Sequence, residues 1–264
     1  MSEGVMRGIE TYEVLGIPVS VGNREALVAR IVDLCQRSEP AIVVPVNPEV
    51  LVIAGRDPAF TQVLKATALN LVDGAGLAWL LSRYAGQKVE RFPGVELVEL
   101  LARESAGSGL RLGFVGGRPG SAERARAALM ASHPGGDIWV GPSLHAAPRP
   151  GRDSEYSGVV RNAGIDVLLV GMGAPKQELW LAENLATCGA RVGVAVGGSF
   201  EILGGLVPRA PLWMRRSNLE WLYRTWREPS RLPRLIALAR LPARVVLARA
   251  SGRAAVAQIL APDT

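Results

Sequence analysis

The chain has 264 residues, 48% of them hydrophobic, which is enough to bury the core of one α/β domain with an appendage. Cys35 and Cys188 stand alone in apolar surroundings, so the sequence excludes a disulfide framework and a cysteine metal site, and we expect two buried, reduced thiols. The net charge is +6, but residues 209–264 hold eleven arginines against three acidic residues, so residues 1–208 carry −2. No run of about 18 uncharged apolar residues occurs, and the N-terminal segment lacks a cationic region followed by an apolar core; both observations predict a cytoplasmic protein that does not span a membrane.

The first part of the chain alternates short apolar runs with helical patterns. We predict a strand or hairpin edge at Val14–Val19, and a helix that Asn23 caps and that runs to Gln36. The next predicted strand, Ala41–Val46, ends in Asn47-Pro48-Glu49. Because proline suits the first turn of a helix, Asn47 is an N-cap candidate. The same position would let Asn47 face the edge of the sheet, although a cap alone is the commoner reason for an asparagine there.

The predicted strand Leu69–Val72 delivers Asp73 to the same kind of strand end. Asp73 is either the N-cap of a helix at Leu77–Tyr84, or a carboxylate that faces the edge of the sheet and accepts a proton from a substrate hydroxyl. Gly74 would allow a ligand to approach the backbone closely, which a cap does not require, so we favour the second interpretation. Most arginines in the next segment are expected to be solvated, but Arg91 lies just before a Phe-Pro-Gly break, and we expect it to bind substrate.

Two glycine-containing turns follow predicted strands in the second half of the chain. The first, Gly116-Gly117-Arg118-Pro119-Gly120 after the strand Leu110–Val115, resembles a phosphate loop of Rossmann-like folds, although it lacks the full GxGxxG spacing and a Walker lysine. The second lies in DVLLVGMGAPKQE, where an apolar strand meets Gly173 and then a helix with Gln177 and Glu178 in its first turn. Helix N-termini attract anions such as phosphate, so we place Gln177 and Glu178 at the mouth of the site; capping of the helix alone is the competing explanation.

Predicted strands at Asp137–Val140 and Arg191–Val196 continue the alternation with helices. The pattern, with glycine at the turns, predicts an α/β fold with a Rossmann-like, mainly parallel sheet that helices cover on both faces. We predict that this core spans residues 1–208 and that residues 209–264 form a basic appendage of amphipathic helices. The appendage interleaves tryptophan with arginine, which suits the interface of an anionic membrane; a helical hairpin packed on the core with its arginines in water is the alternative.

Four stretches together resemble the WecG/TagA/CpsF family of bacterial glycosyltransferases. They are VNPEV at 46–50, LVDGAG at 71–76 with ERFPGVEL at 90–97, GMGAPKQE at 171–178, and the run that begins with VGGSFEILGG at 196 and ends at 234. The resemblance implies an inverting transfer of a sugar, commonly N-acetylmannosamine or its uronic acid, from a UDP-sugar to a polyprenyl-diphosphate-linked saccharide. It also implies work at the inner face of the cell membrane, in cell-surface polysaccharide biosynthesis, with no cofactor and no essential metal.

The resemblance also assigns roles to individual residues. It implies that Asp73 is the catalytic base, that Asn47 lies near acceptor and donor, and that Gln177 is the glutamine of a PxQE motif, and we take these three as catalytic. The expected substrate-binding residues are Arg91, Gly74, Gly116, Gly117, Gly173, Glu178 and, in the appendage, Arg224, Arg231 and Arg234. Pro45 stands where the family usually has a threonine, and Glu96 where it usually has an aspartate, so the donor sugar and the acceptor glycan stay open.

Three other functions compete with a glycosyltransferase. A dinucleotide enzyme would need a phosphate fingerprint after the first strand and an acidic ribose partner about 20 residues further on, and neither is present. Binding to nucleic acid is disfavoured because the positive charge is confined to the appendage. A non-catalytic membrane scaffold, or a nucleotide-binding protein of the same fold, stays open, as does assembly into a homo-oligomer.

Overall fold

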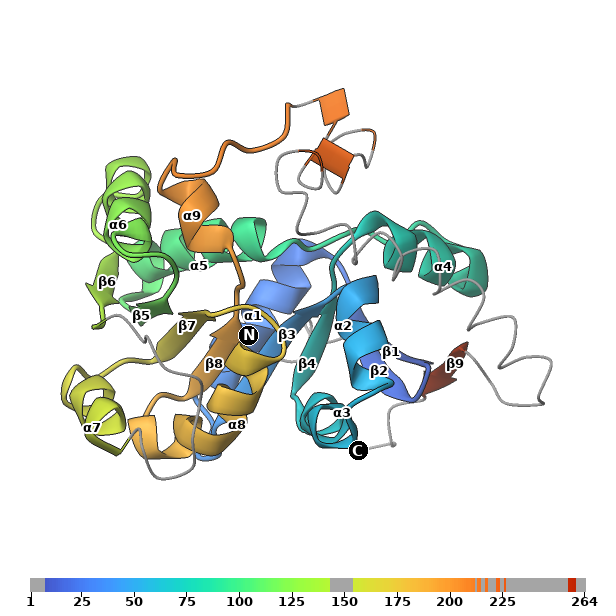
Figure 1. The fold of residues 1–264 in the computed structure, drawn as a ribbon, viewed down its shortest axis with the longest axis horizontal. Helices are drawn as coiled ribbons and strands as arrows, with labels where there is room; N and C mark the ends of the chain where they lie inside the picture. Colours follow the sequence, from blue (N-terminus) through green and yellow to red (C-terminus); the bar gives the residue numbers. More distant parts are fainter. Residues whose placement is uncertain are drawn as a thin grey trace.

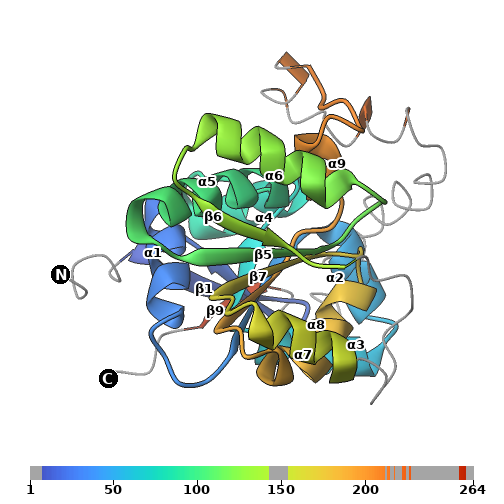
Figure 2. The same ribbon diagram turned by 90° about the vertical axis from the view of Figure 1, so that its left-hand side faces the viewer.

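The computed structural model describes residues 8–142 and 154–211, together with residues 213, 214, 217, 222, 223, 226 and 256–259. These residues form a sheet with helices on both faces (Figure 1, Figure 2). The strands are β1 (Glu10–Val14), β2 (Ile17–Val21), β3 (Ala41–Val46), β4 (Leu69–Val72), β5 (Arg111–Gly116), β6 (Asp137–Val140), β7 (Val167–Gly171), β8 (Val192–Ala195) and β9 (Val256–Ile259). The helices are α1 (Arg24–Leu34), α2 (Pro48–Ala54), α3 (Pro58–Ala66), α4 (Ala75–Ala85), α5 (Gly94–Ser108), α6 (Ser121–Ser132), α7 (Ser154–Asn162), α8 (Lys176–Cys188) and α9 (Ser199–Leu203).

The sheet has the strand order β6-β5-β7-β8-β3-β4-β2-β1-β9. All pairs from β6 to β2 are parallel, and β1 runs antiparallel to both of its neighbours, β2 and β9. The central strands are buried on both faces, which explains continuous apolar runs such as VLLVG in β7. The predicted α/β fold, with a mainly parallel sheet covered on both faces, is confirmed.

One element at the sheet edge confirms the prediction and another differs from it. Of the two interpretations of Val14–Val19, the hairpin is correct: the run joins β1 to β2 through a turn in which Leu15 and Gly16 take φ angles of 52° and 84°. The helical prediction for the end of the appendage is wrong at β9, because this segment pairs with the outer edge of β1.

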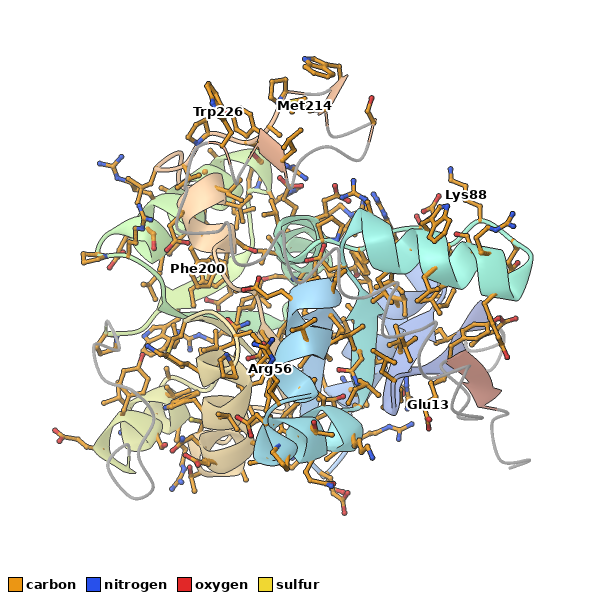
Figure 3. All side chains as sticks on the ribbon, turned by 45° about the vertical axis from the view of Figure 1, so that its right-hand side comes forward. Glu13, Arg56, Lys88, Phe200, Met214 and Trp226 are labelled. Atoms are coloured by element: carbon orange, nitrogen blue, oxygen red, sulfur yellow. The ribbon has the colours of Figure 1, made fainter. Side chains whose placement is uncertain are left out.

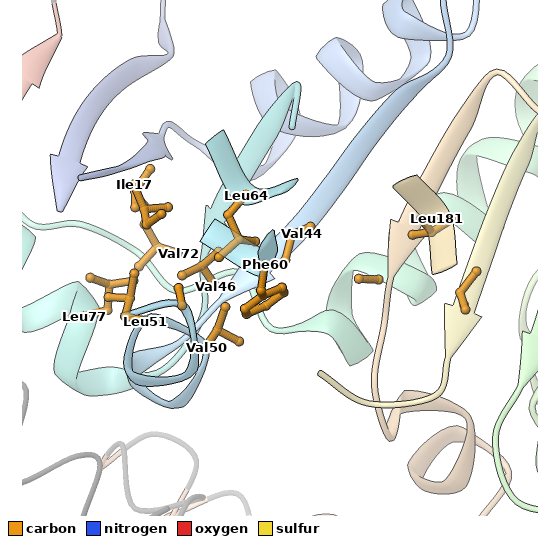
Figure 4. Close-up of a cluster of buried hydrophobic side chains, with 14 of the residues drawn as sticks. Ile17, Val44, Val46, Val50, Leu51, Phe60, Leu64, Val72, Leu77 and Leu181 are labelled. Carbon is orange, nitrogen blue, oxygen red and sulfur yellow. The ribbon is translucent and has the colours of Figure 1, made fainter. Parts of the chain in front are cut away.

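Two apolar clusters, one on each face, hold the helices to the sheet. On one face, Phe60 of α3, Leu77 of α4 and Leu181 of α8 pack with the side chains of the central strands (Figure 4). On the other face, Phe200 of α9 stacks on Phe114 of β5 with ring centroids 4.7 Å apart, among side chains of α1, α5 and α6. Full burial of each such side chain contributes roughly 1.5–3 kcal/mol, so both layers are fixed firmly to the sheet.

Three helices begin with side-chain caps. Asn23 accepts a hydrogen bond from the Ala26 N–H at 2.7 Å, and Asp57 accepts one from the Phe60 N–H at 3.1 Å. Asn47 caps α2 by accepting from two backbone N–H groups, at 3.0 and 3.1 Å. These caps satisfy N–H groups that the helices leave unpaired, and they confirm the starts predicted at Asn23 and Asn47.

The two cysteines are free and buried, as predicted. Burial raises the pKa of the Cys35 thiol to about 12, so it stays protonated at neutral pH. Cys188 is fully buried in the cluster that holds α8 to the sheet. Both residues therefore serve as core side chains.

Candidate active site

The strand order directs a ligand to the carboxyl edge of the sheet. The two neighbours of β8, which are β7 and β3, continue into α8 and α2 on one face, whereas β8 continues into α9 on the other face. In open α/β sheets, ligands bind where adjacent strands send their connections to opposite faces. We call the loops at this edge the strand-end site; they comprise residues 47, 73–74, 116–120, 171–175 and 197–199, and they lie above the sheet in Figure 1.

Asn47 and Asp73 lie side by side in this site. They follow β3 and β4, which pair in parallel with Val46 opposite Val72, and the Asp73 N–H donates to the Val46 carbonyl at 2.8 Å. Gly74 has a φ of 89°, and a Cβ there would lie 3.4 Å from the Asn47 Cβ. Only glycine fits this backbone conformation easily, so Gly74 allows the backbone that follows Asp73 to lie close to Asn47, with little room between the two loops.

The structure places Asp73 one residue before the start of α4. The N-cap of α4 is Gly74, which has no side chain that could cap the helix. Asp73 is partly exposed at the end of β4. This position is compatible with the interpretation of Asp73 as an acid–base group, which stays a prediction.

For Asn47, the cap interpretation is correct, and the cap leaves part of the side chain available for a second role. The cap uses only the side-chain oxygen, Oδ1. Any hydrogen bond from this side chain to a substrate would be donated by Nδ2. The residue is partly exposed, so both uses are compatible with its position.

Gln177 connects the loops after β7 and β8. Its Oε1 accepts hydrogen bonds from the Gly173 N–H and the Gly197 N–H, each at 3.0 Å, and its Nε2 donates to Glu178 Oε1 at 2.8 Å. Gln177 is buried, with 5% of its surface exposed. The predicted position of Gln177 and Glu178 at the mouth of the site is wrong, because both side chains are buried behind these loops. The bond from Gly197 to Gln177 was not predicted, because a bond between residues 20 positions apart leaves no local signal.

Glu178 is a buried carboxyl group behind the same loops. Only 1% of its surface is exposed, and its Oε2 has no hydrogen-bond partner. Burial raises the pKa of Glu178 from 4.5 to about 7, although the hydrogen bond from Gln177 opposes the change. Part of the Glu178 population is therefore neutral near pH 7, which lowers the negative charge next to any bound anion.

The glycine-rich loop after β5 is fixed by an acidic residue that the sequence-based site missed. Glu201 of α9 accepts a hydrogen bond from the Arg118 N–H at 2.9 Å, and its other oxygen is buried without a partner. Gly117 donates its N–H to the Gly171 carbonyl at 2.6 Å, so the loops after β5 and β7 meet. The sequence did contain a signal for this residue, because Glu201 is an acidic residue in the first turn of the helix that follows the last core strand.

Arg91 reaches the same edge through its own segment. The next residue, Phe92, donates its N–H to the Val72 carbonyl at the end of β4, at 2.7 Å. The Arg91 carbonyl accepts from Arg24 at 3.4 Å, and Arg24 also lies 2.8 Å from a Glu96 oxygen. The other Glu96 oxygen binds Arg209 at 2.9 Å. Glu96 thus links the start of α5 to the start of the appendage, a role that sequence reasoning missed.

Several helices point their N-termini at this edge. In the described chain, α4, α5, α6, α8 and α9 all begin without a side-chain cap bond. Their first N–H groups and their dipoles favour an anion such as a diphosphate. The strand-end site therefore combines a carboxylate with positive electrostatic potential from the backbone.

The remaining predicted site residues, Arg224, Arg231 and Arg234, lie outside the described residues. Among the residues that are described, no group of three or more His, Cys, Asp or Glu side chains could hold a metal ion. Within the same part of the chain, no helix is long and apolar enough to cross a bilayer.

The fold and the site define an α/β protein of the doubly wound class, with its ligand site at the carboxyl ends of the strands. The chain belongs to the glycosyl transferase WecG/TagA/CpsF family, whose model matches residues 12–255. It is 28% identical to the N-acetylglucosaminyldiphosphoundecaprenol N-acetyl-beta-D-mannosaminyltransferase of Staphylococcus aureus strain MRSA252. The identity is measured over 204 aligned residues, which cover 76% of this chain and 77% of the relative. The protein of the same name from strain MW2 has the same identity and coverage. The resemblance to this family is confirmed.

Proposed function

We propose that this protein is an inverting glycosyltransferase that moves an N-acetylmannosamine-type sugar from a UDP-sugar to a polyprenyl-diphosphate-linked saccharide. The observation that carries the proposal is the pairing of Asp73 with Asn47 at two adjacent strand ends, within a chain of this family. The names of the Staphylococcus aureus relatives support N-acetylglucosamine as the sugar of the acceptor and N-acetylmannosamine as the transferred sugar.

In the proposed reaction, Asp73 takes the proton of the acceptor hydroxyl. The oxygen of that hydroxyl forms a bond to the anomeric carbon while the bond from that carbon to the UDP oxygen breaks on the opposite side, so the configuration inverts. A carboxylate at a strand end can hold this position because the backbone of Asp73 is bonded to β3. We propose that Asn47 donates from Nδ2 to donor or acceptor while its Oδ1 stays in the cap.

UDP leaves with additional negative charge, which the site must stabilise. We propose that the N–H groups around Gly116, Gly117 and Gly173 and the uncapped helix N-termini provide this stabilisation, with Arg91 nearby. Gln177 then holds two of these loops at the correct separation, and Glu178 acts on the substrate through Gln177, because it is buried. Its neutral form near pH 7 adds no charge that would repel the diphosphate.

We further propose that the appendage, through its arginines, brings the protein to an anionic membrane surface on the cytoplasmic side. Two described appendage side chains, Trp213 and Trp226, have 62% and 74% of their surface exposed. Exposed tryptophans suit the interface between headgroups and acyl chains.

The test is binding of UDP and a panel of UDP-sugars to the purified full chain, measured by calorimetry with and without a chelator. The proposal expects UDP and one N-acetylhexosamine donor to bind with chelator present. A folded sample that binds none of these ligands, even with a lipid-linked acceptor analogue added, would instead support a non-catalytic scaffold.

A further inference from the structure

The outer face of α4 carries an exposed tryptophan next to the strand-end site. Trp79 has 63% of its surface exposed, whereas Leu77, Ala78 and Leu81 bury the opposite side of the helix. Tyr84 has 42% of its surface exposed but packs its ring edge against Tyr12 of β1, so it lies on another side of the helix. Trp79 and Arg83 are four residues apart and therefore share one face of the helix. We call Trp79, Arg83 and Lys88, which lies just beyond the helix end, the α4 face.

The charge of the α4 face is positive. Residues 75–88 include Arg83 and Lys88 and contain no acidic residue. The next acidic side chain, Glu90, lies 4.0 Å from Arg24, so another cation offsets its charge. Aromatic rings beside arginine and lysine are the combination that sits at the interface of an anionic bilayer, where rings enter the headgroup layer and cations meet lipid phosphates.

The α4 face and the described tryptophans of the appendage lie on the same side of the molecule. α4 begins directly after Asp73, so its first turn belongs to the carboxyl edge of the sheet. Figure 1 shows α4 and the described turns of the appendage on this side of the sheet, and Figure 3 shows Lys88, Met214 and Trp226 there. Among the described residues, all three strongly exposed tryptophans, Trp79, Trp213 and Trp226, are on these two elements.

We propose that the α4 face is a second membrane-docking surface, which rests on anionic lipid and turns the strand-end site toward the lipid-linked acceptor. This inference rests on the proposed function, because a lipid-linked acceptor is the reason for a membrane surface beside the strand-end site. Two contacts, one from the appendage and one from α4, fix the orientation of the core, which a single contact does not. A hydroxyl close to the diphosphate of a lipid-linked sugar then lies within reach of Asp73.

The experiment measures binding of the full chain to vesicles by sedimentation, with phosphatidylglycerol in phosphatidylcholine or phosphatidylcholine alone. Arg83→Glu changes two units of charge at the surface and is expected to lower affinity for the anionic vesicles about 25-fold, at about fivefold for each charge. Trp79→Ala is expected to lower it about 3- to 10-fold. Lys65→Glu on α3 and Val159→Ala on α7 are matched controls, because both side chains are exposed away from this edge, and their affinity is expected to stay within about twofold of wild type.

A second readout separates docking from chemistry. The α4 variants are expected to keep wild-type turnover on a water-soluble, short-chain acceptor and to lose turnover on the same sugar held in vesicles.

Wild-type vesicle binding by both α4 variants would overturn the proposal, as would wild-type binding that does not depend on anionic lipid. A change in oligomeric state by light scattering, with vesicle binding unchanged, would show that a second copy of the chain covers this face instead. A wild-type protein that docks through α4 but transfers no sugar to any acceptor would defeat the proposed function and leave the docking surface in place.

Discussion

The buried carboxyl of Glu178 makes the stability of the protein depend on pH in a predictable direction. Its pKa is about 7 in the folded protein, compared with 4.5 for an ordinary glutamate, because burial disfavours the charged form. The folded state therefore holds this proton more tightly than the unfolded state does. The contribution to stability is complete below about pH 4.5, falls as the pH rises, and is lost above about pH 7.

The magnitude follows from the same two pKa values. At about 1.4 kcal/mol for each pH unit, ionisation of Glu178 lowers the free energy of unfolding by roughly 2–3 kcal/mol between pH 5 and pH 8. Glu178→Gln removes the titration while its amide oxygen still accepts the hydrogen bond from Gln177. The difference in unfolding free energy, variant minus wild type, is therefore expected to become more positive by roughly 2–3 kcal/mol over this range.

The assay is urea denaturation of both proteins at pH values from 5 to 8, with tryptophan fluorescence as the signal. Taking the difference cancels the titration of every other group. Glu183→Gln, on the exposed side of the same helix, is the matched control for the loss of one carboxyl from α8. Parallel curves for Glu178→Gln and wild type would refute the assignment of a raised pKa to this carboxyl.

Three further predictions concern neighbouring parts of the molecule. Asn47→Ala should cost about 1 kcal/mol of stability and lower activity, whereas Asn47→Ser keeps a capping oxygen and should lower activity alone; wild-type turnover in the serine variant would exclude donation from Nδ2. Gly74→Ala should cost roughly 1–3 kcal/mol in thermal or urea unfolding because of the φ of 89°, whereas Gly107→Ala, inside α5 with open space around it, should be neutral or stabilising. Replacement of both Trp213 and Trp226 by alanine should weaken binding to anionic vesicles several-fold, and unchanged binding would contradict a membrane role for the appendage.

Local chemistry made most of the core predictable. Asn23, Asn47 and Asp57 each cap a helix by bonding N–H groups two or three residues away, so the signal for the helix start lies in the sequence itself. The parallel strands are equally visible, because burial on both faces requires an uninterrupted apolar run. The fold class needed no information beyond this alternation.

Elements whose partners lie far along the chain were not predictable in this way. β9 exists because it pairs with β1 at the other end of the chain, and no local pattern shows that the edge of β1 needs a partner. A tertiary contact decides this element, and local propensity does not.

The candidate site shows the same division. The sequence placed Asn47, Asp73 and Gln177 at strand ends, since each follows an apolar run, and the parallel register brings the first two together. It did not show that Gln177 connects two loops through its Oε1, or that Glu201 binds a backbone N–H 83 residues away. Such contacts depend on how strands are ordered in the sheet, which only the folded structure provides.

The most direct test of the account is transfer of N-acetylmannosamine from its UDP donor to a short-chain polyprenyl-diphosphate N-acetylglucosamine, with the anomeric configuration of the product read by NMR. The account predicts an inverted product from the wild-type protein and a turnover about 10²- to 10⁴-fold lower in Asp73→Asn, which should still fold. Asp57→Asn is the matched control, because asparagine also caps a helix, and it should turn over at the wild-type rate. A product with retained configuration, or an Asp73→Asn variant as active as wild type, would contradict the role assigned to the strand-end site.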